Sequence, residues 1–362
     1  MKHKFYNIRG KRYAKLGQLD AAIICYEKAI SIKPKYVEAH YNLGFTHHKL
    51  GQLDEAIRSY KKVVAINPAY AETHNNQILT VIYFFSNGQV PDAIDTLKLL
   101  IKDSPDDALL FNMMGGCFVS LGQIDMAIKN YEKALNLYPN YAIPQHMLNS
   151  LTGYTSKEPP KEYVKNLFDD YAEKFDDSLV GGLQYQLPFI IKDIIQKTSS
   201  SKSKFLKTID LGCGTGLSGK DLREISKNLS GVDISENMIS KAKELNIYDN
   251  LFVGDIVEVL SSDREKYDLF VALDVLIYVG DVESIFKAVR EYCHRESLFV
   301  FSIEVQEEDG YSLLKSSRYA HSDSYIMNQA SGSFVLIDSQ NVRLRKEGNN
   351  WINGKIYIFK AS

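Results

Sequence analysis

The fold of the second half of this chain is decided by nine residues, TIDLGCGTG at positions 208–216. A short apolar run leads into a turn with glycine at positions 212, 214 and 216. Glycine lets a backbone adopt positive φ and approach a ligand with no Cβ in the way, and a following helix presents unpaired N–H groups. A dinucleotide fingerprint needs its last glycine at position 217, which is Leu217, so the pattern disfavours an NAD-linked oxidoreductase.

Short apolar runs alternate with helix-compatible segments from residue 205 onward. The runs are Phe205–Leu211, Leu229–Asp233, Leu251–Gly254, Tyr267–Ala272 and Ser297–Ile303. Such alternation predicts a parallel, doubly wound α/β sheet with a Rossmann-like arrangement. We expect a seven-stranded core over residues 205–362, preceded by a helical cap over residues 161–204.

Acidic residues follow the apolar runs, where the carboxyl ends of parallel strands meet and ligands bind. Asp233 is placed to accept hydrogen bonds from both hydroxyls of a ribose, with Ile234 and Met238 as apolar cover for an adenine. Asp255, after the next run, is placed to accept the amino hydrogens of that adenine. Each of the two aspartates has a simpler alternative as a helix N-cap.

These segments together resemble motifs I to IV of the class I S-adenosylmethionine-dependent methyltransferases. They are TIDLGCGTG (208–216), GVDIS (231–235), VGDI (253–256) and YDLFVALDVL (267–276). The resemblance implies S-adenosylmethionine as the cofactor. It also implies that Asp210 holds the glycine loop or contacts the amino group of the cofactor, and that Cys213 is a small turn residue and no nucleophile.

The resemblance extends to a bacterial group of predicted methyltransferases, of the type 11/12-like kind, that carry tetratricopeptide repeats. In such enzymes an N-terminal helix lays a tyrosine over the cofactor, and Tyr171 matches that place. The tail Gly348–Lys360 would form an antiparallel strand pair at the sheet edge. The implied cofactor site comprises Tyr171, Asp210, Gly212, Cys213, Gly214, Thr215, Gly216, Asp233, Ile234, Met238, Asp255, Ile256, Asp274, Val275 and Leu276.

The first 151 residues are periodic. The prolines at 34, 68, 105 and 139 recur at about the same interval, and GQLD at 17–20 recurs at 51–54 and, as GQID, at 122–125. In the frame that this period sets, small residues fill two positions and tyrosine fills a third. These residues are Gly10, Gly44 and Gly115, then Ala22, Ala56, Ala93 and Ala127, then Tyr26, Tyr60 and Tyr131. The pattern resembles the tetratricopeptide repeat, in which two amphipathic helices meet closely at the small residues and neighbouring pairs stack into a superhelix.

Four copies start near residues 3, 37, 71 and 108, and a capping helix follows over 142–151. The third copy departs from the pattern, with Ile78 where glycine is usual and three residues inserted before Ala93, which we interpret as a locally distorted turn. A linker over 152–160, with Pro159 and Pro160, separates the array from the methyltransferase domain at 161–362.

The concave side of such an array favours docking of a protein partner or protein substrate, the alternative being a structural or dimerising role. A clamp for acidic chaperone tails would need lysine, asparagine and arginine at set positions. This chain instead has Asn7, Lys11, Asn42, Glu72 and Asn76 there, so that clamp is not assembled.

Composition excludes several other classes. The 43 lysines and arginines nearly balance 45 acidic residues, and no basic stripe favours a nucleic acid partner. Four scattered cysteines lack CxxC spacing, so we expect neither a metal site nor a disulfide framework. The apolar stretch Ile78–Phe85 is too short to cross a membrane, and no signal peptide is visible at the start. We therefore expect a cytoplasmic protein.

The methyl acceptor is the least determined part of the site. His321 is a candidate base, Arg318 a candidate clamp for a carboxylate, and Tyr278 and Tyr185 candidate lining residues. The segment around His321 is equally compatible with the start of a surface helix, with Ser322 and Asp323 capping it. The acceptor is a small metabolite or a protein side chain, and a non-catalytic scaffold with a degenerate methyltransferase fold is the rival interpretation.

Overall fold

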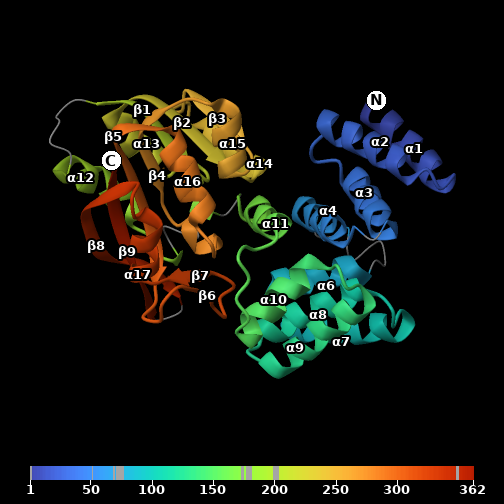
Figure 1. Ribbon diagram of the computed structural model, residues 1–362. Helices are drawn as coiled ribbons and strands as arrows, with labels where there is room; N and C mark the ends of the chain where they lie inside the picture. The colour runs from blue at the N-terminus through green and yellow to red at the C-terminus, as the bar shows by residue number, and fades with distance from the viewer. Residues whose placement is uncertain are drawn as a thin grey trace. The chain divides into compact units, whose positions relative to one another are not determined.

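The computed structural model describes residues 2–50, 52–67, 70, 77–172, 175–176, 182–198, 204–347 and 350–362. The chain separates into two compact units, Met1–Leu148 and Asn149–Ser362. Helices alone build the first unit in the part that is described, and a sheet covered by helices builds the second (Figure 1). The expected fold class, a helical repeat array followed by an α/β domain, is confirmed.

The first unit is a series of antiparallel helix pairs. Its helices are α1 (Lys2–Lys15), α2 (Leu19–Ile32), α3 (Val37–Lys49), α4 (Leu53–Ile66), α6 (Gln77–Ser86), α7 (Val90–Asp103), α8 (Ala108–Ser120) and α9 (Ile124–Leu137), followed by α10 (Ala142–Thr152). Within each repeat the two helices pack on each other, and each repeat packs on the next. The expected start of the third copy near residue 71, with Glu72 and Asn76, lies outside the described residues.

The periodic glycines lie where two helices of a repeat come closest. A Cβ on Gly10 would lie 2.5 Å from the ring of Tyr26, and one on Gly115 would lie 2.5 Å from the ring of Tyr131. Gly44 stands in the same relation to Tyr60, at 2.9 Å. These separations are far below an ordinary contact between carbon atoms, so the ring occupies the space that a side chain would need.

The third copy solves the same packing problem with different residues. Its α6–α7 turn is regular, since Gly88 has φ +75° where Gly17 has +74° and Gly122 has +69°. The distortion that we expected is therefore not in this turn, and the inserted residues lie before it. Counted back from Gly88, the glycine position is Val81 and not Ile78, and the tyrosine position is Leu97; both are buried. Val81 and Leu97, two side chains of medium size, thus take the places that glycine and tyrosine have in the other copies.

The second unit contains a nine-stranded sheet within the described residues. Its strands are β1 (Phe205–Leu211), β2 (Ser226–Asp233), β3 (Asn250–Val253), β4 (Tyr267–Ala272), β5 (Cys293–Val305), β6 (Tyr311–Leu313), β7 (Tyr319–His321), β8 (Phe334–Glu347) and β9 (Asn350–Ala361). Strands β3-β2-β1-β4-β5 are parallel neighbours in that order, and β9 pairs antiparallel with β5 and with β8. Because the order reverses at β1 and β4, their carboxyl ends open a crevice.

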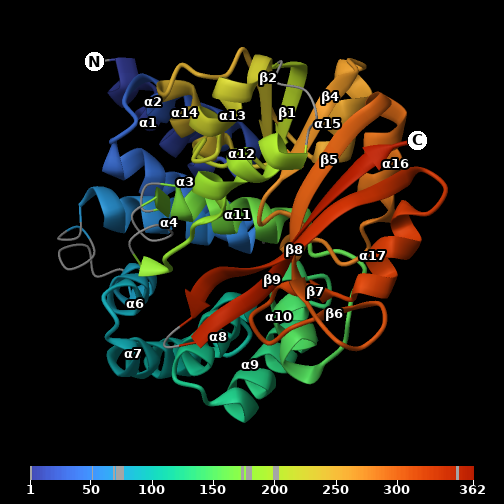
Figure 2. The same cartoon turned by 90° about the vertical axis from the view of Figure 1, so that its left-hand side faces the viewer.

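Two features of the sheet differ from the expectation. The antiparallel pair at the edge is formed by β8 and β9 over residues 334–361, so the tail Gly348–Lys360 supplies only its second strand. The short strands β6 and β7 pair with each other, and β7 extends the sheet beside the end of β5. These two strands bring the described total to nine instead of seven (Figure 2).

Helices cover both faces of the sheet. On one face α15 (Ile256–Asp263), α16 (Glu283–Tyr292) and α17 (Asp323–Ala330) share an apolar core with the strands. On the other face α12 (Leu187–Thr198) and α13 (Gly219–Ile225) do the same. Helix α14 (Glu236–Glu244) packs against β2 and β3, and α11 (Lys161–Tyr171) packs against α14.

The segment expected as a linker is attached to the second unit. The Leu313 N–H donates to the Thr155 hydroxyl at 3.1 Å, and the hydroxyls of Ser156 and Tyr319 lie 2.8 Å apart. The Asp281 N–H donates to the Lys157 carbonyl at 2.6 Å. Residues 155–157 therefore form a strap along the sheet domain.

Candidate cofactor and acceptor site

The glycine turn after β1 has the backbone conformation that its residues predict. Gly212, Gly214 and Gly216 have φ of +70°, +55° and +91°. The Gly212 and Cys213 N–H groups donate to the Val232 carbonyl, which fixes the turn to the end of β2. A Cβ on Gly212 would overlap a methyl of Val275, so glycine is required there by contact as well as by φ.

Asp233 is nearly buried at the end of β2 and faces the glycine turn. One carboxylate oxygen accepts from the Gly214 N–H at 2.9 Å, and the other accepts from the Ser235 N–H at 2.9 Å. Burial raises the pKa of Asp233 to about 6, and the backbone N–H groups oppose that shift. The N-cap of α14 is Ser235, so the N-cap alternative for Asp233 is wrong.

Asp255 has the cap role that was the simpler alternative for it. Its carboxylate accepts from the Val257 N–H at 2.9 Å and the Glu258 N–H at 3.2 Å, at the start of α15. The ammonium of Lys161 lies 3.4 Å from the other carboxylate oxygen of Asp255 and 2.7 Å from Glu258. Asp255 still lines the cavity described below.

Asp210 is buried beneath the turn and holds it. It accepts from the Ser218 hydroxyl at 2.8 Å and from the Tyr248 hydroxyl at 2.8 Å. Burial raises the pKa of Asp210 to about 6, while both hydroxyls oppose the shift. Burial also raises the pKa of the Cys213 thiol well above its ordinary value, as expected of a packing residue and not of a nucleophile.

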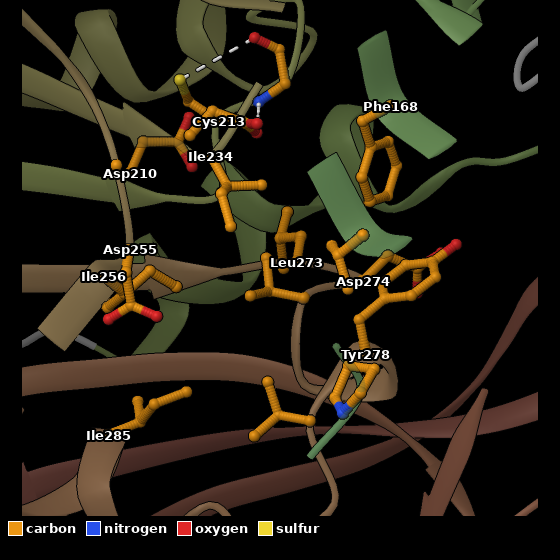
Figure 3. Close-up of a pocket in the computed structure, with 18 of the residues that line it drawn as sticks. Phe168, Asp210, Cys213, Ile234, Asp255, Ile256, Leu273, Asp274, Tyr278 and Ile285 are labelled. Carbon is orange, nitrogen blue, oxygen red and sulfur yellow. Dashed lines mark hydrogen bonds between the residues drawn. The ribbon is translucent and has the colours of Figure 1, made fainter. Parts of the chain in front are cut away.

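A single cavity at the carboxyl ends of β1, β2 and β4 brings most of the expected residues together (Figure 3). The expected cofactor residues that line it are Asp210, Gly212, Cys213, Gly214, Asp233, Ile234, Asp255, Ile256, Asp274 and Val275. In the close-up Asp210 and Asp255 lie on one side, Asp274 and Tyr278 on the other, and Ile234 and Leu273 between them. The arrangement offers carboxylates on both sides of one bound molecule, with an aromatic ring beside Asp274.

Five expected cofactor residues are not among the lining residues. Thr215 donates to Asp176 at 2.5 Å, and Gly216 packs near Leu245. Met238 and Leu276 are fully buried in the interior. Tyr171 is 37% exposed, and the aromatic rings that line the cavity from this part of the chain belong to Phe168 and Phe175.

Helix α11 is fixed over the cavity by contacts that the sequence did not reveal. The Ser235 hydroxyl donates to the Asp169 carboxylate at 2.7 Å, and the Asn237 side-chain amide donates to the Asp169 carbonyl at 2.9 Å. Phe168, one residue earlier, lines the cavity and meets Tyr278 edge to face at 5.0 Å between ring centroids. Asp169 thus ties the helix that carries Phe168 to the start of α14.

Two of the four candidate acceptor residues lie outside the cavity lining. His321 is fully buried on β7, its Nε2 lies 3.0 Å from the Gly280 carbonyl, and burial lowers its pKa to about 4. The next residue, Ser322, caps α17 by accepting from the Tyr325 N–H, as the helix-start alternative anticipated. Arg318 is paired with Glu304 and Glu347. Tyr278, whose pKa burial raises to about 12, lines the cavity, and so does the buried Tyr185.

Sequence reasoning missed the buried Arg345, which is 2% exposed. Its Nη1 donates to Asp274 at 3.1 Å, its Nη2 donates to Glu304, and its Nε lies 3.4 Å from Glu347. Together with Arg318 these residues form a cluster of two guanidinium groups and three carboxylates. Asp274 is the member of the cluster that lines the cavity. A charged residue in a strand is ordinarily exposed, so no local signal marked Arg345.

Neither of two other kinds of site is found in the described part of the chain. No group of three or more His, Cys, Asp or Glu side chains there is arranged to hold a metal ion. The helices that could be searched are too short or too polar to cross a membrane.

A parallel sheet with this glycine turn and this cavity defines a nucleoside-binding α/β domain. Residues 202–347 match the family model described as a methyltransferase domain. Residues 10–51, 37–70 and 108–141 match models of the tetratricopeptide repeat. The chain therefore joins tetratricopeptide repeats to a methyltransferase domain.

The chain is similar over part of its length to curated ubiquinone biosynthesis O-methyltransferases. That of Coxiella burnetii (strain RSA 493) is 34% identical over 85 residues, which is 22% of this chain and 35% of the relative. That of Pelagibacter ubique is 28% identical over 108 residues, 29% of this chain and 45% of the relative. The chain thus spans less than half the length of these two relatives.

Among solved structures, magnesium protoporphyrin IX methyltransferase of Synechocystis PCC 6803, with bound S-adenosylmethionine, is 20% identical. Its TM-score is 0.40, and the match covers 56% of this chain and 97% of that one. An N-methyltransferase of Bradyrhizobium japonicum is 13% identical with a TM-score of 0.37, over 47% of this chain and 85% of that one.

Proposed function

We propose that this protein binds S-adenosylmethionine in the cavity at the ends of β1, β2 and β4 and transfers its methyl group to an acceptor. The observation that carries the proposal is the position of Asp233. Its carboxylate lies at the end of β2, lines the cavity and holds the glycine turn through the Gly214 N–H. An acid at this place accepts ribose hydroxyls in doubly wound nucleoside sites.

The other lining residues fit the rest of such a cofactor. Ile234 and Ile256 offer apolar surface for an adenine, and Asp255 lies next to Ile256 to accept its amino hydrogens. The positive-φ glycines of the turn have no Cβ, so a ligand can approach its backbone closely. When bound, the cofactor supplies a methyl group on a sulfonium, an electrophile that needs no metal.

The residues of the chain would then align the acceptor and exclude water, which are the main requirements of an in-line transfer. Phe168 and Phe175 cover the cavity, and Tyr185, Leu273 and Tyr278 wall its other end. The O-methyltransferase names of the partial relatives support an acceptor hydroxyl on a small molecule. The tetratricopeptide repeats support a docked protein, either as substrate or as partner.

Calorimetry tests the proposal against its two rivals. The full chain should bind S-adenosylhomocysteine and not NADH, whereas a non-catalytic scaffold binds neither and an oxidoreductase binds NADH. Asp233→Asn keeps the shape of the side chain but removes its charge, so S-adenosylhomocysteine affinity should fall by a factor of about 10 or more.

Asp193→Asn is the matched control, because Asp193 is an exposed aspartate on α12 of the same unit and does not line the cavity. Its affinity should equal that of the wild type. Equal affinity of the wild type and Asp233→Asn would remove Asp233 from the cofactor site.

A further inference from the structure

The charges that line the cavity are strongly unbalanced. Within the described chain the lining includes five acids, and its one cation is Lys161. Lys161 is already paired with Glu258 at 2.7 Å and Asp255 at 3.4 Å. The acids are Glu158, Asp210, Asp233, Asp255 and Asp274.

Asp274 differs from the other four acids in its surroundings. It follows β4 with φ +55°, a conformation uncommon outside glycine and asparagine, and its N–H donates to the Ser302 hydroxyl at 2.8 Å. Its Oδ2 accepts from Arg345 at 3.1 Å. Its Oδ1 is buried and has no hydrogen-bond partner among the described residues. An unsatisfied buried carboxylate oxygen is costly, and a ligand that donates a hydrogen bond there removes the cost.

The cations near Asp274 are not available to a ligand. Arg345 uses Nη1, Nη2 and Nε toward Asp274, Glu304 and Glu347. Arg318 is paired with Glu304 and Glu347 as well. The cluster has three carboxylates and two guanidinium groups, so it carries one net negative charge. A carboxylate or phosphate at this end of the cavity would be repelled.

We propose that Asp274 Oδ1 receives the hydrogen of the acceptor, and that the acceptor group is an uncharged O–H or N–H donor and not an anion. This rests on the proposed function. The acceptor oxygen or nitrogen forms its bond to the methyl carbon as the sulfur–methyl bond breaks. The electron pair of the broken bond stays on sulfur, which becomes a neutral thioether, and the proton of the acceptor passes to Asp274 Oδ1.

The groups around Asp274 suit this role. Burial raises the pKa of Asp274 and makes it a better base, while Arg345 opposes the shift and keeps the ionised form accessible. Tyr185 and Tyr278 are the other titratable groups that line this end, and burial raises both of their pKa values, so each remains a neutral phenol.

Sinefungin tests the proposal without knowledge of the acceptor, because its ammonium group replaces the sulfonium methyl of the cofactor. Affinities for sinefungin and for S-adenosylhomocysteine are measured on the full chain by calorimetry. The wild type should prefer sinefungin. Asp274→Asn, which keeps the side-chain shape and tolerates positive φ, should lose at least tenfold of that preference, because it weakens sinefungin binding more than S-adenosylhomocysteine binding.

Glu347→Gln is the control, since it removes one negative charge from the same cluster at a residue that does not line the cavity. It should keep the preference. An equal loss of both ligands in Asp274→Asn, or an equal loss of preference in Glu347→Gln, would overturn the assignment to Asp274 Oδ1. Failure of the wild type to bind S-adenosylhomocysteine would instead refute the proposed function.

Discussion

Adjacent glycines on α8 make the packing of the repeats testable. A Cβ on Gly115 would lie 2.5–2.8 Å from three ring atoms of Tyr131, whereas a Cβ on Gly116 would meet nothing within 4 Å. Alanine stabilises a helix interior by about 1 kcal/mol relative to glycine. Overpacking of a well-filled interior costs about 1–3 kcal/mol. Gly116→Ala should therefore stabilise the first unit by up to about 1 kcal/mol, and Gly115→Ala should be less stable than Gly116→Ala by about 1–3 kcal/mol.

Urea unfolding of the full chain measures this difference with two separate probes. Far-UV circular dichroism follows the helices, most of which belong to the first unit, and the fluorescence of the single tryptophan, Trp351 on β9, follows the second unit. Gly115→Ala should move the dichroism transition and leave the Trp351 transition in place. Equal shifts for the two variants would refute the idea that the Tyr131 ring demands glycine at position 115.

Three further predictions concern the second unit. S-adenosylhomocysteine affinity should fall as pH drops below about 6, because ribose hydroxyls bond best to ionised Asp233; calorimetry across pH should show the fall in the wild type and a flatter profile in Asp233→Asn. The folded-state pKa of His321, about 4, lies below its ordinary 6.5, so the stability that its neutral form contributes is complete above pH 6.5 and is lost as pH falls toward 4. At pH 5 this should lower the free energy of unfolding of the wild type by about 2 kcal/mol. Urea unfolding followed by Trp351 fluorescence should show a smaller decrease in that free energy between pH 7.5 and pH 5 for His321→Gln than for the wild type. Asp169→Ala should release α11 and speed S-adenosylhomocysteine dissociation, measured by stopped flow. In the control Glu162→Ala, an exposed position on the same helix, S-adenosylhomocysteine should dissociate at the wild-type rate. Equal rates for both variants would mean that Asp169 does not hold α11 over the cavity.

The parallel strands could be predicted because short apolar runs alternate with helix-compatible segments, and Gly212, Asp233 and Gly254 mark where three of these runs give way to a turn. Asp210 and Asp233 could be predicted to lie near the glycine turn because both stand at the carboxyl ends of neighbouring parallel strands. The antiparallel pair β8–β9 was harder to predict, because β8 includes the polar stretch Asp338–Asn341 and has little apolar periodicity.

Side-chain direction and pairing between distant residues limit how much of the site the sequence predicts. Tyr171 and Phe168 lie on one short helix, and the choice between them depends on a rotation that the sequence does not report. Arg345 and Asp274 are 71 residues apart in the chain and meet only when β8 and β4 join one sheet. Burial likewise moved His321 from a candidate base to a neutral interior residue.

The exchange of Gly and Tyr for Val81 and Leu97 in the third repeat carries a consequence for how such arrays diverge. If the ancestral copy held a glycine–tyrosine pair, a change of glycine first would drive a side chain into the ring, as the 2.5 Å separation at Gly10 indicates. A change of tyrosine first would leave only a void, which a later, larger neighbour fills. A path that avoids this clash therefore loses the ring before it gains the branched side chain.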